Sequence, residues 1–151
     1  MLELTENLGP VPAPAGSAGL TLDFDQRSRT RLRAVLDDGR EAAVMLPHGR
    51  GMREGDVLRS KEGATAVVRC KTEKVITVRV PDWPSLARAA YHFGNRHAEL
   101  QLGDLFLRFR PDPALEKMAA SLGLAARAEE TAFIPEPGPG QHFRGCHGHG
   151  N

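Results

Sequence analysis

The C-terminal run GCHGHGN carries three side chains that can ligate a metal ion: Cys146, His147 and His149. The glycines between them leave the backbone free to fold around an ion, while imidazole and thiolate groups coordinate it. A packed core would not require these residue types here. A closed zinc site needs two paired ligand clusters at defined spacing, and the sequence has only one. The pattern therefore predicts an incomplete metal site that another segment or another chain completes.

A second pair of histidines, His92 and His97, lies in the run YHFGNRH. Five residues advance a helix by about 500°, which leaves the two side chains about 140° apart, so a regular helix cannot bring both to one ion. Gly94 is expected to end the helix and let His97 turn away. We interpret His92 as a helix-surface or packing residue. His97 lies where the helix meets the next strand and is a candidate ligand.

Composition and charge limit the classes to which the protein can belong. Hydrophobic residues make up 40% and charged residues 26% of the sequence, as in soluble globular proteins. No apolar run approaches the roughly 18 residues of a membrane span, and the start MLELTEN has no signal-peptide pattern. A net charge of +1 argues against strong nucleic-acid binding. We expect a cytoplasmic protein with reduced cysteines and with neither a membrane nor a nucleic-acid partner.

The motifs of common enzyme classes are missing. The sequence contains no HExxH, no GxxxxGKS or GxxxxGKT, and no GxSxG. The run His48-Gly49-Arg50-Gly51 is only loosely similar to a phosphate-binding glycine loop, and we interpret it as a tight turn. We therefore expect a protein that is not an enzyme.

The first half of the sequence consists of short β-type runs separated by turn residues. The candidate strands are LRAVL, EAAVML, VLRS and TAVVRC. An Asp-Gly pair at 38–39 between the first two is a strong hairpin signal. We interpret residues 9–19, rich in Pro, Gly and Ala, as a flexible loop and residues 27–33 as a solvated strand edge. The pattern predicts a small all-β barrel or sandwich domain over residues 1–74.

From Val75 onward, strand patterns alternate with helical ones. Two helices are predicted at 82–94 and 112–123, each with an Asp N-cap, a proline in the first turn and a glycine at the end. Between them, Gly103-Asp104 is expected to form the two-residue type II′ loop of a hairpin. The order βαββαβ predicts a ferredoxin-like domain over residues 75–140 and hence an α+β protein. An RNA-binding role for this fold is disfavoured because aromatic residues make up only 5% of the sequence.

The run ARAAYHFGNRHAELQ closely resembles the central YHxGNRH segment of the UreE family, the urease accessory nickel metallochaperones. Three further runs are similar to parts of that family: DGREAAVMLPHGRGMREGDVL, PALEKMAASLGL and AFIPEPG. The resemblance covers nearly the whole chain.

The resemblance implies three parts with separate roles. Residues 1–74 would bind partner proteins or peptides, residues 75–140 would bind metal and form a homodimer, and residues 141–151 would be a flexible metal-binding tail. His97 would face its counterpart across the two-fold axis, so that two imidazoles hold one Ni²⁺ per dimer. The tail residues expected to complete the site are His142, Cys146, His147 and His149.

The implied function is that of a nickel metallochaperone, which binds Ni²⁺ at the homodimer interface and delivers it to apo-urease. The implied partners are the urease accessory GTPase, UreG, and the apo-urease activation complex. The tail has few histidines, so storage of several ions is not expected, and Cys146 favours softer metals such as zinc or copper in vitro. A histidine that the family carries before its second helix has no counterpart in residues 108–112. The alternative function is a peptide-binding chaperone or scaffold with an incidental metal site.

Overall fold

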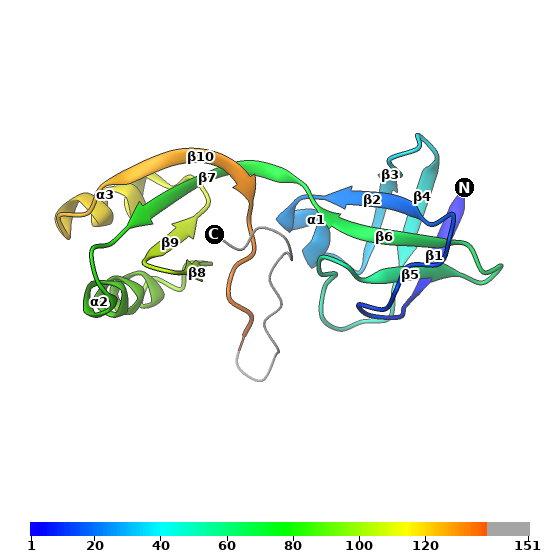
Figure 1. Ribbon diagram of the computed structural model, residues 1–151, viewed down its shortest axis with the longest axis horizontal. Coiled ribbons are helices and arrows are strands. Elements are labelled where there is room, and N and C mark those ends of the chain that lie inside the picture. The colour runs from blue at the N-terminus through cyan, green and yellow to red at the C-terminus, as the bar shows by residue number, and fades with distance from the viewer. Residues whose placement is uncertain (139–151) are drawn as a thin grey trace. The chain divides into compact units, whose positions relative to one another are not determined.

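The structure, a computed structural model, describes residues 1–138, which divide into two compact units, Met1–Lys71 and a second unit that begins at Thr72 (Figure 1). The sequence-based boundary after residue 74 falls inside the first strand of the second unit, because that strand already begins at Thr72. Residues 139–151, which include the four candidate tail ligands, lie outside the described part of the chain.

The first unit is one six-stranded sheet with the order β2-β6-β5-β1-β4-β3. Its elements are β1 (Leu2–Asn7), β2 (Ala18–Leu22), α1 (Phe24–Ser28), β3 (Arg31–Val35), β4 (Glu41–Met45), β5 (Val57–Ser60) and β6 (Thr65–Cys70). The outer strands β2 and β3 meet at one point, where the amide of Asp37 donates to the carbonyl oxygen of Gly19 over 2.9 Å. The sheet is thus a nearly closed barrel, which confirms the predicted class.

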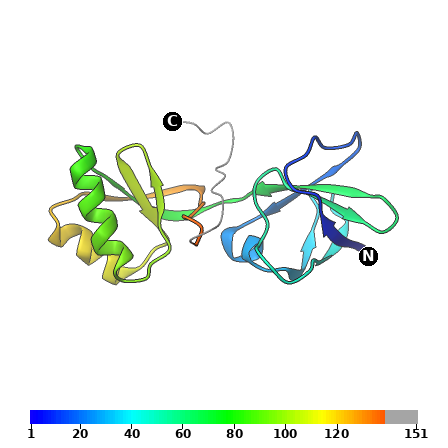
Figure 2. The ribbon, with the colours of Figure 1, turned by 90° about the horizontal axis from the view of Figure 1, so that it is seen from below.

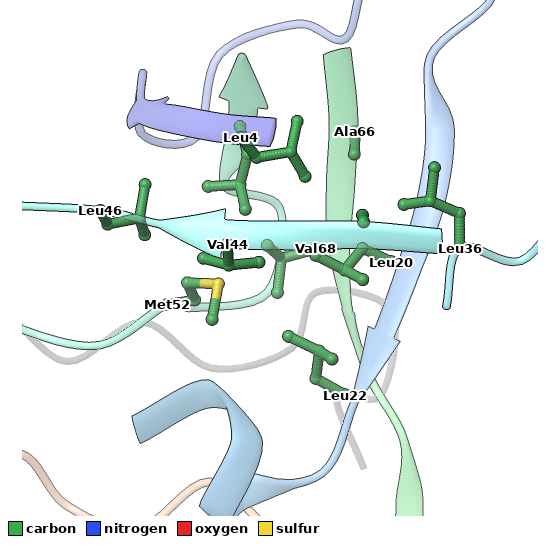
Figure 3. Packing of buried hydrophobic residues seen from close by; sticks show 11 residues of the cluster. Leu4, Leu20, Leu22, Leu36, Val44, Leu46, Met52, Ala66 and Val68 are labelled. Carbon is green, nitrogen blue, oxygen red and sulfur yellow. The ribbon is translucent and has the colours of Figure 1, made fainter. Parts of the chain in front are cut away.

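Apolar side chains from both ends of this sheet fill the interior of the barrel. Leu4, Leu20, Val44 and Val68 come from four different strands, and each is at most 1% exposed. Figure 3 shows their side chains pointing toward one another, with Met52 beside them. Burial of large aliphatic side chains supplies the main stabilisation of such a unit, at about 25 cal/mol per Å² of apolar area.

Three elements of this unit were not predicted. The sequence analysis assigned no strand to β1, took residues 9–19 as a loop although β2 begins at Ala18, and missed α1. The interpretation of residues 27–33 as a strand edge was wrong for Arg27, because it belongs to α1, is only 4% exposed and donates from Nη1 to the carbonyl oxygen of Leu22 over 2.8 Å. A capping box at Asp23 and Gln26 starts this helix.

The second unit has the predicted order βαββαβ. Its elements are β7 (Thr72–Arg79), α2 (Trp83–Gly94), β8 (Gln101–Gly103), β9 (Phe106–Phe109), α3 (Pro113–Ser121) and β10 (Ala126–Ala132). The sheet order β10-β7-β9-β8, with every neighbouring pair antiparallel, is that of a ferredoxin-like domain. Both helices cover one face of the sheet (Figure 2), and Phe93 stacks on Phe109 at a centroid distance of 5.4 Å in the core between them.

The four helix ends follow the prediction. Asp82 accepts from the amide of Ser85 and Asp112 from that of Ala114. Gly123, with φ of +70°, ends α3 in a Schellman motif, since Leu124 N–H bonds to the carbonyl oxygen of Ala119 and Gly123 N–H to that of Ala120. Helix α2 ends at Gly94, as predicted, although Gly94 does not have a positive φ.

The predicted hairpin loop is displaced by one residue. Gly103 pairs with Phe106 as the last residue of β8, so the loop is Asp104-Leu105, and the positive φ of +58° belongs to Leu105. A type II′ turn with Gly103 at its first central position is therefore wrong. Gly103 has a different use: a Cβ there would overlap the ring of Phe106.

Candidate metal centre around His97

His97 lies in the turn that follows α2 and is exposed. Gly94 is the last residue of the helix, Asn95 still has αR dihedrals, and the chain reverses only at His97, whose φ is +55°. Its amide donates to the carbonyl oxygen of Gly94 over 3.0 Å. A left-handed conformation is rare for a residue with a Cβ, although histidine adopts it more often than most. The expectation that the helix ends at Gly94 is confirmed, and the chain reverses three residues later, at His97 itself.

Helix α2 leads to His97 and has two apolar faces. Leu86, Ala89 and Phe93 form the buried one. At about 100° per residue, a second set falls within an arc of about 100° on another side of the helix. That set, called here the α2 apolar face, is Trp83, Ala87, Ala90, Tyr91 and Gly94.

The α2 apolar face is open to solvent in the single chain. Trp83 is 58% and Tyr91 66% exposed, and these are two of the largest side chains of the protein. Small residues, Ala87 and Ala90, lie between them and allow a second helix to approach closely. An apolar surface of this kind marks an interaction site. The sequence analysis followed only the buried stripe and missed this one, although its spacing could have been read directly.

The segment after β10, residues 133–138, is called here the C-terminal strap. It is fastened to the start of β8: Ile134 N–H donates to Oε1 of Gln101 over 3.0 Å, and Glu136 N–H donates to the carbonyl oxygen of Leu100 over 2.7 Å. Phe133 is fully buried, and the guanidinium of Arg110 lies 5.9 Å from the centre of its ring. The strap is therefore anchored at Leu100, which lies three residues after His97 in the sequence.

The sheet face away from the helices carries a polar network. Nε of Arg108 donates to Oγ1 of the buried Thr77 over 2.9 Å, and Thr77 donates to Glu129 over 2.8 Å. Burial lowers the pKa of Arg108, Glu129 acts in the opposite direction, and neighbouring Arg79 lowers it further. The network joins β7, β9 and β10 and holds their register, so we assign it a structural role.

The described residues contain two further histidines, His92 and His48. His92 is exposed and meets the edge of the Tyr91 ring, at a centroid distance of 5.4 Å, and His48 is exposed in the other unit. Within residues 1–138, no group of three or more His, Cys, Asp or Glu side chains is placed to hold a metal ion. His142, Cys146, His147 and His149 lie outside this range, so their expected role as ligands stays a prediction.

Comparison with known proteins covers both units. Residues 4–71 match the family model described as UreE urease accessory protein, N-terminal domain, and residues 73–151 match the one described as UreE urease accessory protein, C-terminal domain. The chain belongs to the UreE family of urease accessory proteins. This assignment places it in urease maturation, among accessory proteins rather than enzymes.

Individual relatives are similar to this chain over most or nearly all of its length. The urease accessory protein UreE of Alkalilimnicola ehrlichii is 49% identical over 138 residues, which cover 91% of this chain and 83% of that protein. The UreE protein of Pseudomonas putida strain GB-1 is 44% identical over 150 residues, 99% of this chain and 90% of that protein. In the part of the chain that the structure describes, no helix is long and apolar enough to cross a membrane.

Proposed function

We propose that the protein is a cytoplasmic nickel carrier that works as a homodimer, with one Ni²⁺ held between the two copies of His97 and delivered to apo-urease. The observation that carries this proposal is the position of His97, an exposed imidazole in a turn directly after the α2 apolar face. UreG and the apo-urease activation complex are the proposed recipients.

The dimer part of the proposal rests on the α2 apolar face. A two-fold axis that pairs this face with its copy would bury Trp83 and Tyr91 from each chain. Because α2 ends within three residues of His97, the same axis would bring the two imidazoles toward each other. One histidine per chain would then supply two ligands, and imidazole suits Ni²⁺.

The strap supports a contribution from the tail. Glu136 is hydrogen-bonded to Leu100, and His142 follows six residues later. Because an extended chain spans at most about 3.3–3.6 Å per residue, His142 can lie up to about 20 Å from that anchor, and His97 lies within about 10 Å of it. Tail ligands are thus tethered within reach of an ion at His97. Tethering gives them a high local concentration while leaving each bond easy to break.

Such a site would suit a carrier rather than a resident cofactor. Two ligands from the folded domains are too few to hold the ion permanently, and the others belong to a terminal segment. A recipient with a more complete ligand set can replace the tail groups one at a time. Affinity for the metal alone would favour Cu²⁺ over Ni²⁺, so selectivity would come from metal availability and from the partner proteins.

The test is a Ni²⁺ titration followed by native mass spectrometry, with the wild type and His97→Ala compared. We expect one tightly held ion per dimer in the wild type and none in the variant, with the dimer itself intact. One ion per monomer that survives the substitution would assign binding to the tail alone and would refute the shared site. A chain truncated after Gly138 should keep the dimer and bind nickel more weakly.

A further inference from the structure

The outer edge of β3 is unpaired. In the β3–β4 ladder, Leu46 N–H donates to the carbonyl oxygen of Thr30, and Leu36 N–H donates to that of Arg40. Hydrogen-bonded residues alternate along an antiparallel pair, so the even-numbered residues of β3 face β4. Arg31, Arg33 and Val35 therefore direct their N–H and C=O groups away from the sheet.

The remainder of the described chain leaves these groups open. Strand β3 pairs only with β4 among the described strands and ends the sheet order. Asp37, two residues beyond Val35, closes the barrel against β2 with two hydrogen bonds: its amide donates to the carbonyl oxygen of Gly19, and its side chain accepts from Oγ1 of Thr21. Within residues 1–138, no backbone hydrogen bond reaches the outward groups of Arg31, Arg33 or Val35. The edge offers a row of donors and acceptors to an added strand.

The side chains along this edge are cationic and free. Arg31 and Arg33 are exposed on the outer face of the sheet, and Arg29 is exposed immediately before the strand. None of these three guanidinium groups has an ion pair or a side-chain hydrogen bond with any residue of the described range. On the same face, Glu41 lies opposite Val35 on β4, and Glu3 lies on β1, two strands from the edge; Val35 is 59% exposed at the end of the strand.

Charge decides which partner the edge fits. A second copy of this strand would place arginine against arginine, and like charges directly opposite each other destabilise a ladder. Arginines on an edge strand thus protect the protein from self-association. The same residues favour an extended segment whose carboxylates lie on every second position, because such a segment would pair with the backbone edge and place its acidic side chains beside Arg31 and Arg33.

We propose that the β3 edge of the N-terminal unit is a docking site for an acidic, extended segment of a partner protein, which binds as an additional strand. Main-chain hydrogen bonds would supply affinity, and the alternating acidic side chains would supply selectivity. This surface is separate from the nickel site and does not depend on the proposed carrier function.

The test uses the full chain and a fluorescein-labelled peptide, Thr-Glu-Thr-Glu-Thr-Glu-Thr, with the corresponding Lys peptide as the control ligand. Binding is followed by fluorescence anisotropy at low salt and by backbone amide shifts in NMR spectra. We expect the acidic peptide to bind, the Lys peptide not to bind, and the largest shifts at the amides of Arg31, Arg33 and Val35.

Two kinds of variant separate charge from strand pairing. Arg31→Glu with Arg33→Glu should weaken binding about tenfold or more, because attractive cross-strand pairs become repulsive. Arg33→Pro should also abolish binding without disturbing β4, since it removes an N–H that points away from that strand. Arg69→Glu is the matched control: it is an exposed arginine on β6, a strand paired on both sides.

Three results would overturn the proposal: no binding of the acidic peptide, full binding by Arg33→Pro, or a loss with Arg69→Glu equal to that of the double reversal. The second would show that strand pairing is not used, and the third that the attraction is only general electrostatics. A nickel titration of the same variants should match the wild type, so a failure here is distinguishable from a failure of the carrier function.

Discussion

The amide of Glu136 donates a 2.7 Å hydrogen bond to the carbonyl oxygen of Leu100, and this bond fastens the last described part of the chain to the segment that carries His97. The two residues are 36 positions apart in sequence, yet the strap brings them into contact. The point from which the tail departs is therefore fixed by the fold.

Replacing Gln101 tests whether this anchoring matters for metal binding. Gln101→Leu removes the acceptor for Ile134 N–H and should loosen the strap while leaving β8 folded. We expect nickel affinity to fall by roughly three- to tenfold, because the effective concentration of the tail ligands decreases. Isothermal titration calorimetry measures the change. The same substitution in a chain truncated after Gly138 should have no effect, and an equal loss in both backgrounds would show that Gln101 acts on His97 directly.

The α2 apolar face should control dimerisation. Ala87→Glu inserts a carboxylate at the centre of the face, where pairing with a second copy would bury it at a cost of several kcal/mol per unpaired charge. We expect a monomer by analytical ultracentrifugation, and the loss of the one-ion-per-dimer stoichiometry with it. Ala114→Glu makes the same substitution at an exposed position in the first turn of α3 and should leave the dimer unchanged. A dimeric Ala87→Glu protein would locate the interface elsewhere.

The φ of +55° at His97 allows its role in the fold to be tested separately from its proposed role as a ligand. His97→Gly and His97→Ala both remove the imidazole, so both should lose the tight nickel site. Glycine adopts the left-handed region freely, whereas a Cβ there costs about 1–2 kcal/mol. The glycine variant should therefore be more stable than the alanine variant by about that amount in urea denaturation. Equal stability would mean that the turn relaxes when the histidine is lost.

Hydrophobic periodicity and turn residues were sufficient to predict most elements of the second unit. Alternation in β7 and one buried apolar stripe on each helix were enough to predict the βαββαβ order, since each signal is local. The loop at Asp104-Leu105 was misplaced because Gly103 is required by contact with Phe106, which is a tertiary reason for a glycine and not a turn signal. In the first unit, β2 was hidden in a run rich in Gly and Ala, and only its parallel pairing with β6 makes it a strand.

The candidate site was predictable only in part. The histidine motif singled out His97 as a candidate ligand, but the left-handed turn there depends on how the chain continues after the end of α2. The strap could not be foreseen, because its hydrogen bonds join segments that share no sequence pattern. The β3 edge was recognised as charged, whereas its unpaired backbone follows from the register with β4 and from the closure of the barrel at Asp37, beyond the end of the strand.

Acid should weaken the start of α2 through Asp82. Its side chain accepts from Ser85, which lowers the pKa of the carboxyl group below its ordinary value of 3.8. A lowered folded-state pKa stabilises the fold above the ordinary value, and this contribution is lost as the pH falls through the lowered one. Asp82→Asn keeps a capping group that does not titrate. Thermal melts from about pH 6 to about pH 3 should thus show a smaller loss of stability for Asp82→Asn than for the wild type; parallel curves would refute the assignment.

Gly103 should be intolerant of a side chain. A Cβ at this position would overlap the ring of Phe106, which is also held by the guanidinium of Arg108 at 4.8 Å from its centre. Gly103→Ala should destabilise the second unit by about 1–3 kcal/mol, because overpacking forces the ring out of its place. In a Phe106→Leu background the ring is absent, and the same glycine substitution should cost much less. Urea denaturation of the four proteins gives the coupling energy, and a value near zero would mean that Gly103 is needed for its backbone rather than for the contact with the ring.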